Sequence, residues 1–339
     1  MKELRLALLG FGNAGRAFAK LLLEKEEKIK ERFGYGVYVT AIATGTRGNI
    51  VNPRGIDLME ALRDIERAGR FSSGTVNLTT MDIVKTADYD VLVEMTPLNI
   101  FTGQPAISHI EEAFSRRKHV ITANKGPIAW KYSELNRKAC RAGVKFFYET
   151  TVMDGTPVFN LVDKTLQMAE VTEVTGILNS TTNFVLEELS KGADYDDIME
   201  RGRRKGFIEA DPAMDIEGYD AAAKITALLN VLMDADITPD QVERKGIEDI
   251  TSEDIRAAES RGNVIKLVCR GSRKDGKVHA KVAPEEIPAG DMLASVNSTT
   301  SVVSITTDLM KTISIFEHEP EIEQTAYGIF GDMLRVISE

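Results

Sequence analysis

A short glycine-rich turn close to the N-terminus restricts the possible folds of this chain most. The apolar run of residues 4–9 leads directly into Gly10-Phe-Gly-Asn-Ala-Gly15, and helically spaced apolar residues follow. This is the pattern G-x-G-x-x-G in the strand–turn–helix context that makes it informative, because the backbone can then approach a pyrophosphate at the start of a helix. The turn predicts a dinucleotide site, and a glycine turn without a ligand is the alternative. The predicted contact residues are Gly10, Phe11, Gly12, Asn13, Ala14 and Gly15.

The second predicted strand, residues 37–43, ends without the acid that usually binds the ribose hydroxyls of NAD. Its end reads Ala43-Thr-Gly-Thr-Arg47. A guanidinium at this place can form charge-assisted hydrogen bonds with a 2′-phosphate. The sequence therefore favours NADP over NAD, and a solvated loop arginine is the alternative interpretation of Arg47.

Strands and helices are predicted to alternate up to about residue 148. Further strands are expected at 90–94, 119–122 and 144–148, and helices at 57–68, 107–117 and 133–142. Such alternation indicates a mostly parallel sheet covered by helices. Thr96 and Lys125 follow two of these strands, so they are expected at the carboxyl edge, where ligands of such folds bind. Alternatively, Thr122 or Asn124, at the end of the strand 119–122, serves only as a helix cap.

The second half of the chain has a different order and is predicted to be α+β. Helices are expected with N-terminal caps at Ser180 or Thr181, at Asp194 and near Asp215, and a final helix at 325–337. Residues 264–270 and 277–283 indicate a hairpin with a long turn at 271–276. Residues 283–290 are the only segment that resembles a linker.

Composition limits the possible functions. A chain of 339 residues with 43% hydrophobic residues is expected to fold into two domains. The net charge of −10 makes nucleic acid an unexpected partner. No signal-peptide pattern or membrane-length apolar run is found, so a cytoplasmic protein is expected. Cys140, Cys269 and the four scattered histidines fit neither a disulfide framework nor a zinc site.

The middle third places a lysine among acids. Asp220 and Lys224 are four residues apart and would share one helix face. A surface ion pair is the simplest interpretation, but the run Ala221-Ala-Ala-Lys224-Ile is apolar around the lysine and predicts a buried helix. A buried lysine needs partners, and the available ones are Glu209, Asp215 and Asp220. An ammonium among carboxylates is a candidate proton donor and substrate anchor.

Several motifs of the chain, in order and spacing, resemble homoserine dehydrogenase. They are Gly206-Phe-Ile-Glu209-Ala-Asp211-Pro212, Gly176-Ile-Leu-Asn-Ser-Thr-Thr-Asn183, Thr122-Ala-Asn-Lys125 and Glu149-Thr-Thr-Val152-Met-Asp-Gly-Thr-Pro157. The resemblance is to the short form, without a fused kinase or a C-terminal regulatory domain. It implies an α/β protein with a Rossmann-like dinucleotide-binding domain, residues 1–148 completed by a helix at about 323–339. Residues 149–322 would form an α+β catalytic and dimerisation domain of a homodimer.

The resemblance also implies a reaction, the reversible reduction of L-aspartate 4-semialdehyde to L-homoserine by NAD(P)H, a step toward threonine, methionine and isoleucine. Lys224 then resembles the proton donor, and Lys125 a lysine shared by cofactor and substrate. The implied substrate residues are Glu209, Asp220, Asn179, Ser180 and Thr181, and the implied further cofactor residues are Thr96 and Gly206. Positions that hold a monovalent cation, usually sodium, match Glu149, Val152, Asp154 and Thr156.

The chain departs from the family pattern at three places. Met153-Asp154-Gly155 replaces Gly-Ala-Gly in the cation loop, Ser180 replaces a more usual glycine, and the acidic segment 319–324 replaces a glycine-rich one. These changes bear on cation binding and on cofactor contacts. Two other functions stay open: a related dehydrogenase for another amino-acid aldehyde, and a non-catalytic dinucleotide-binding regulator.

Overall fold

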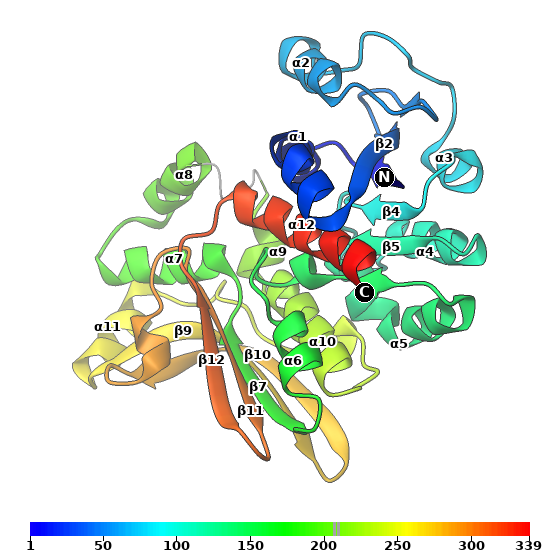
Figure 1. The fold of residues 1–339 in the computed structure, drawn as a ribbon. Coiled ribbons are helices and arrows are strands. Elements are labelled where there is room, and N and C mark those ends of the chain that lie inside the picture. Colours follow the sequence, from blue (N-terminus) through cyan, green and yellow to red (C-terminus); the bar gives the residue numbers. More distant parts are fainter. Residues whose placement is uncertain (206–207, 209–210) are drawn as a thin grey trace. The chain divides into compact units, whose positions relative to one another are not determined.

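The computed structural model describes residues 1–205, 208 and 211–339. It divides into two compact units, Met1–Phe159 with Glu321–Glu339, and Asn160–Pro320. Each unit contains one six-stranded sheet with its own helices (Figure 1). The predicted α/β fold class is confirmed.

The sheet of the first unit has the strand order β3-β2-β1-β4-β5-β6. Its strands are β1 (Lys2–Leu9), β2 (Tyr35–Ala43), β3 (Ile50–Val51), β4 (Val91–Glu94), β5 (His119–Thr122) and β6 (Phe146–Phe147). All neighbours are parallel except the short β3, which is antiparallel to β2. The chain moves from β1 to β2 on one side and later to β4 on the other, so ligands are expected beyond the carboxyl ends of β1 and β4.

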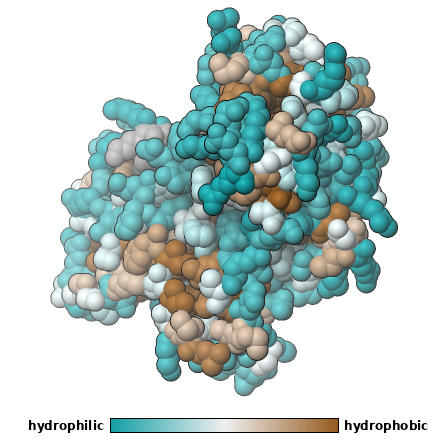
Figure 2. Space-filling model, in the orientation of Figure 1, coloured by the Kyte–Doolittle hydropathy of each residue, from teal (hydrophilic) through white to brown (hydrophobic). Residues whose placement is uncertain are grey.

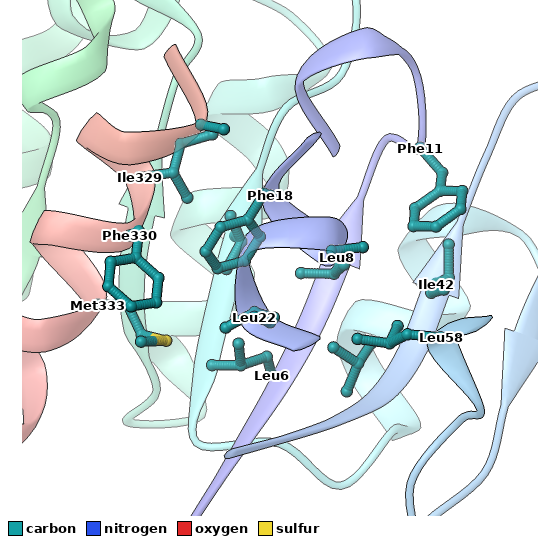
Figure 3. Close-up of a cluster of buried hydrophobic side chains, with 14 of the residues drawn as sticks. Leu6, Leu8, Phe11, Phe18, Leu22, Ile42, Leu58, Ile329, Phe330 and Met333 are labelled. Carbon is teal, nitrogen blue, oxygen red and sulfur yellow. The ribbon is translucent and has the colours of Figure 1, made fainter. Parts of the chain in front are cut away.

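The helices of this unit are α1 (Asn13–Phe33), α2 (Leu58–Ala68), α3 (Thr80–Thr86), α4 (Ala106–Ser115), α5 (Lys125–Ala142) and α12 (Ile322–Ser338), with the 3-10 turn η1 (Glu149–Thr151). The last helix belongs to the first core. Ile329, Phe330 and Met333 of α12 join the cluster that contains Phe18 and Leu22 of α1 (Figure 3). Burial of these side chains supplies the main driving force for docking α12.

The sheet of the second unit has the order β12-β11-β7-β9-β10-β8 and is antiparallel except for the β10–β8 pair. Its strands are β7 (Val171–Ile177), β8 (Glu243–Arg244), β9 (Asn263–Lys274), β10 (Lys277–Pro288), β11 (Ser301–Thr307) and β12 (Lys311–Glu317). The helices are α6 (Phe159–Thr165), which begins at the boundary, α7 (Ser180–Ser190), α8 (Tyr195–Lys205), α9 (Ala213–Ile216), α10 (Tyr219–Leu232) and α11 (Ser252–Ser260), with 3-10 turns η2 (Pro239–Gln241) and η3 (Met292–Ser295).

The predicted long turn of the hairpin is wrong. The β9–β10 register pairs Lys274 with Lys277, which leaves only Asp275 and Gly276 between the strands. Both residues have positive φ, 51° and 74°, as a tight two-residue hairpin turn requires. The strands therefore extend through the segment predicted as a loop.

The prediction of a linker-like segment at residues 283–290 is also wrong, because β10 continues to Pro288. Prolines are tolerated there because β8 pairs only with Lys281 and Val282, and within the described part of the chain no other strand pairs with β10 on that side. Two helix starts differ as well. Asn179, rather than Ser180 or Thr181, caps α7 by accepting from the Thr182 N–H at 2.8 Å. Asn124 caps α5, which begins at Lys125.

Hydrophilic residues cover most of the face seen in Figure 2, and hydrophobic areas interrupt them. Among the described residues, no helix combines the length and hydropathy needed to cross a bilayer.

Candidate active site

The three glycines of the first turn have three different structural roles. A Cβ on Gly10, whose φ is 101°, would lie 2.4 Å from the Met95 carbonyl oxygen, so this residue must be glycine. A Cβ on Gly15 would lie 2.6 Å from the Gly10 carbonyl oxygen. A Cβ on Gly12 would meet no atom within 4 Å. The first and third glycines thus allow close packing, and the second leaves the approach to the helix start open, as a pyrophosphate requires.

The surroundings of this turn favour an anion. α1 has no acidic residue in its first turn and no side-chain cap at Gly12, so its first N–H groups keep their positive character. The Arg47 Nη1 donates to the Phe11 carbonyl oxygen at 3.2 Å, which holds its guanidinium beside the turn. The Phe11 side chain is buried and packs on Phe71, with ring centroids 5.7 Å apart. Phe11 can therefore contact a cofactor only through its backbone.

The carboxyl ends of β4 and β5 are joined by hydrogen bonds. The Asn124 side chain donates to the Thr96 carbonyl oxygen at 3.1 Å and accepts from the Gly126 N–H at 3.0 Å. Asn124 is thus a helix cap, as the alternative interpretation proposed, and it also ties Thr96 to the start of α5. Lys125, the first residue of that helix, is half-buried.

In the second unit, four of the predicted site residues form one cluster. The Asn179 side-chain nitrogen donates to Asp215 at 2.7 Å and to Asp220 at 2.9 Å. The Lys224 Nζ lies 3.0 Å from the Asp220 carboxylate and donates to the Leu178 carbonyl oxygen at 2.7 Å. The side chains of Lys224 and Asp220 are only 20% and 14% exposed, so the simple surface ion pair is not what the structure contains.

The two carboxylates of this cluster influence each other. Burial raises the pKa of Asp215, and the neighbouring charge of Asp220 raises it further, against the hydrogen bond from Asn179. Asp220 is the acid that contacts the lysine directly. A cationic group of a substrate would relieve the repulsion between these acids, so the cluster is suited to bind an ammonium group.

Ser180 and Thr181 occupy the first turn of α7, beside this cluster. The Ser180 hydroxyl donates to the Thr299 carbonyl oxygen at 3.0 Å, and the Thr181 hydroxyl contributes a hydrogen bond to Asp215. Two predicted site residues, Gly206 and Glu209, lie outside the described residues.

The candidate cation loop lies at η1 and the residues after it. The Glu149 carboxylate accepts from the N–H groups of Val158 and Phe159 at 2.6 and 2.8 Å. The Asp154 carboxylate accepts from the Thr325 hydroxyl at 2.6 Å. Both carboxylates are therefore engaged by protein groups, and the Thr156 carbonyl oxygen also accepts a hydrogen bond, from the Val158 N–H at 2.8 Å. Among the described residues, no cluster of three His, Cys, Asp or Glu side chains suits a metal ion.

Comparison with known proteins decides the family. A model of the homoserine dehydrogenase NAD-binding domain matches residues 10–149, and a homoserine dehydrogenase model matches residues 157–334. A homoserine dehydrogenase from Methanocaldococcus jannaschii is 36% identical over 335 residues, which cover 98% of each chain. The chain belongs to the homoserine dehydrogenase family. The predicted class of NAD(P)-dependent oxidoreductase is thereby confirmed, and the non-catalytic regulator is not supported.

Other members of the family match with similar coverage. An NAD(+)-dependent homoserine dehydrogenase from Pseudomonas canavaninivorans is 34% identical over 99% of this chain and 97% of its own. The crystal structure of a protein from Archaeoglobus fulgidus assigned to the homoserine dehydrogenases is 32% identical, with a TM-score of 0.88 and coverage of 99% and 100%. A hyperthermophilic archaeal homoserine dehydrogenase in complex with NADPH is 27% identical, with a TM-score of 0.83 and coverage of 98% and 97%.

Sequence reasoning missed three buried polar groups. Glu94 ends β4 with 0% exposure, and the α4 residue His109 lies beside it with 4% exposure. An acid that follows the buried run Val91–Val93 was the available signal, because a charged residue at a fully buried strand position needs a partner. Lys266 of β9 is a third buried group, 3% exposed and distant in sequence from every motif.

Proposed function

We propose that this protein catalyses the reversible NAD(P)H-dependent reduction of L-aspartate 4-semialdehyde to L-homoserine. The observation that carries the proposal is the cluster of Lys224, Asp220, Asp215 and Asn179 in a chain of this family. A half-buried ammonium held by one carboxylate, with a second carboxylate beside it, can serve an aldehyde that also bears an amino group.

The roles of the residues follow from their hydrogen bonds. The bound cofactor would supply the hydride to the aldehyde carbon. Asp220 holds the Lys224 ammonium in place through their contact, and the Lys224 Nζ would donate a proton to the aldehyde oxygen, directly or through water. Asp215 and Asp220 accept from the substrate ammonium, while Asn179 fixes the orientation of both carboxylates. On its position in the family pattern alone, Lys125 is assigned the positive charge that stabilises the developing alkoxide.

The proposal extends to other residues of the resemblance. Ser180 and Thr181 complete the substrate pocket, and Glu209 adds a carboxylate. Gly206 and Thr96 contact the cofactor. A monovalent cation such as sodium, where bound, would be held by backbone carbonyls of the loop that contains Glu149, Val152, Asp154 and Thr156. Each of these roles rests on position in the family pattern.

We propose NADP as the preferred cofactor. β2 ends at Ala43 without an acid in the loop that follows, and the only charged side chain of that loop, Arg47, is hydrogen-bonded to the glycine turn. This arrangement suits a 2′-phosphate and offers no carboxylate to the ribose hydroxyls of NAD. NAD remains usable where the pyrophosphate contacts dominate.

We also propose that the protein is a cytoplasmic homodimer that uses the second sheet. Leu309 and Met310, at the turn between β11 and β12, are 66% and 56% exposed, and β12 is the edge strand of its sheet. Hydrophobic surface is visible in the lower part of Figure 2, where Figure 1 shows these strands. An apolar edge of this kind is suited to association with a second copy.

The direct test is turnover by the purified protein. L-Homoserine with NADP+ at alkaline pH should produce NADPH, which absorbs at a wavelength where NADP+ does not. Other amino alcohols of similar size serve as comparison substrates, since a preference for one of them would identify the related dehydrogenase instead. Inactivity toward L-homoserine with both NADP+ and NAD+ would contradict the proposed function.

A further inference from the structure

A buried carboxylate lies at the carboxyl edge of the first sheet, where the cofactor is expected to bind. Glu94, the last residue of β4, is completely buried, and its Oε1 accepts hydrogen bonds from both the hydroxyl and the backbone N–H of Thr96, the latter at 3.2 Å. The His109 Nδ1 from α4 lies 3.6 Å from the same oxygen. All three groups belong to the first unit.

This arrangement lowers the stability of the fold, so packing alone does not explain it. Among the described residues, neither the Glu94 Oε2 nor the His109 Nδ1 has a hydrogen-bond partner. Burial of a carboxylate with one unsatisfied oxygen destabilises a fold, and an apolar side chain of similar size would pack at lower cost. The carboxylate must therefore be explained by what it does to its neighbour, Thr96.

Glu94 determines which hydrogen bonds Thr96 can still form. A threonine hydroxyl has one proton, and that proton is donated to Glu94, as is the backbone N–H. The Thr96 carbonyl already accepts from Asn124 at 3.1 Å. The remaining capacity of Thr96 consists of lone pairs on its hydroxyl and carbonyl oxygens, so Thr96 can only accept hydrogen bonds from a ligand.

The order of the strands indicates which half of the cofactor Thr96 would contact. Arg47 follows β2, the glycine turn follows β1, and Thr96 follows β4, in the spatial order β2-β1-β4. The Met95 N–H donates to the Leu9 carbonyl oxygen at 2.7 Å, so Thr96 lies next to the turn. With the 2′-phosphate at Arg47 and the pyrophosphate at the turn, the group beyond β4 is the nicotinamide half.

We propose that Glu94 is a positioning residue that makes Thr96 an obligate hydrogen-bond acceptor for a donor on the nicotinamide half of the cofactor. The donor is a ribose hydroxyl or the carboxamide NH₂, because these are the hydrogen-bond donors of that half. The proposal deepens the proposed function and rests on the cofactor site described there.

Two substitutions of Glu94 separate this role from packing. Glu94→Gln keeps an acceptor oxygen for Thr96, whereas Glu94→Met keeps the length and removes the acceptor. We expect Glu94→Gln to bind NADPH within about threefold of the parent protein, and Glu94→Met to bind it roughly tenfold more weakly. KM for L-homoserine should change less than KM for NADP+ in both variants. The melting temperature of each variant controls for unfolding.

A cofactor analogue distinguishes the two donors. The 3-acetylpyridine analogue of NADP+ lacks the carboxamide N–H. If the carboxamide is the donor, Glu94→Met should not weaken binding of the analogue. If a ribose hydroxyl is the donor, Glu94→Met should weaken binding of the analogue and of NADP+ equally. Should Glu94→Met not fold, Thr96→Val against Thr96→Ser gives the same comparison, because only serine keeps the hydroxyl.

Two outcomes would overturn the proposal. One is a folded Glu94→Met protein with parental affinity for NADPH, and the other is a Glu94→Gln protein that binds NADPH as weakly as Glu94→Met does. Binding is followed by the fluorescence of NADPH and needs no substrate. Failure of homoserine turnover would therefore contradict the proposed function without affecting this test.

Discussion

The ammonium of Lys224 is held by the Asp220 carboxylate and the Leu178 carbonyl oxygen, so its position does not depend on a bound substrate. Lys224→Met keeps the apolar stem in the packed helix and removes the charge. We expect turnover of L-homoserine to fall by roughly 10²–10⁴-fold, as for other losses of general acid–base catalysis. NADPH affinity and melting temperature should stay close to those of the parent protein. Near-parental turnover of a folded Lys224→Met protein would show that Lys224 has only a structural role.

Arg47 is expected to discriminate between the two dinucleotides. Arg47→Ala removes the only charged side chain of the loop after β2, so the variant should lose affinity for NADP+ and keep its affinity for NAD+. We expect the ratio of kcat/KM for NADP+ to that for NAD+ to fall by about tenfold or more, because one charge-assisted hydrogen bond is lost. Arg16→Ala, at a neighbouring guanidinium bonded to the Gly12 carbonyl oxygen, is the comparison variant. An unchanged ratio in Arg47→Ala would contradict the 2′-phosphate role.

Lys266 makes the stability of the second unit depend on pH. Burial lowers the pKa of Lys266 to about 8, while the charge of Glu187 opposes this shift. In an unfolded chain the lysine titrates near pH 10.4, so between about pH 8 and 10.4 the unfolded chain binds a proton that the native protein lacks. The contribution of this group to the free energy of unfolding therefore rises over that range, and it is lost as pH falls through about 8.

The measurement is a difference between two proteins. The free energy of unfolding of the parent minus that of Lys266→Met should increase between pH 7.5 and 10, because all other titrating groups are common to both. The variant also leaves the Asn183 and Asn297 side-chain oxygens without the Lys266 donor, which adds a constant cost. A difference that does not vary with pH would show that Lys266 has an ordinary pKa.

At the scale of single elements, the sequence predicted those elements whose local signals agree with their burial. The glycine turn, β1 and α1 were recognisable because strand, turn and helix patterns follow each other within residues 4–22. α10 was recognisable because its apolar residues surround Lys224 on nearly every side. The cluster of Asp220 and Lys224 followed from helix periodicity alone.

Other elements could not be predicted because tertiary contacts decide them. β11 contains several Ser and Thr residues, and its strand conformation depends on pairing with β7, more than 100 residues earlier in the chain, while β12 pairs with β11. The contact of Glu94 with His109 joins a strand to a helix that only the fold brings together. The hairpin turn was missed because residues 271–274 are polar and glycine-containing, features that loops share with exposed strand ends.

The tight turn between β9 and β10 gives a prediction of its own. Gly276 has a φ of 74°, so Gly276→Ala should lower the free energy of unfolding by about 1 kcal/mol through backbone strain. Asp275→Asn is the matched control at φ 51°, since asparagine tolerates this conformation well, and it should change stability by a few tenths of a kcal/mol at most. Chemical denaturation measures both. Equal stability of Gly276→Ala and the parent protein would contradict the assigned turn.

At the scale of the whole molecule, the proposed homodimer can be tested at the tip of β11 and β12. Leu309→Asp combined with Met310→Asp places two charges on the exposed apolar turn, and desolvating them in an interface would be unfavourable. We expect the parent protein to sediment as a dimer and the double variant to shift toward the monomer. Met59→Asp, on the exposed face of α2 in the first unit, should leave the dimer intact. A monomeric parent protein would refute the proposed assembly.

The first unit is built from both ends of the chain, and this affects how the protein emerges from the ribosome. The core around Phe18 and Leu22 is completed by Ile329, Phe330 and Met333 of α12, whereas the second unit is continuous from Asn160 to Pro320. The second unit can therefore acquire all its contacts while the nascent first unit still exposes the apolar face of α1. The core of the dinucleotide-binding half is consequently completed last, although most of that half is translated first.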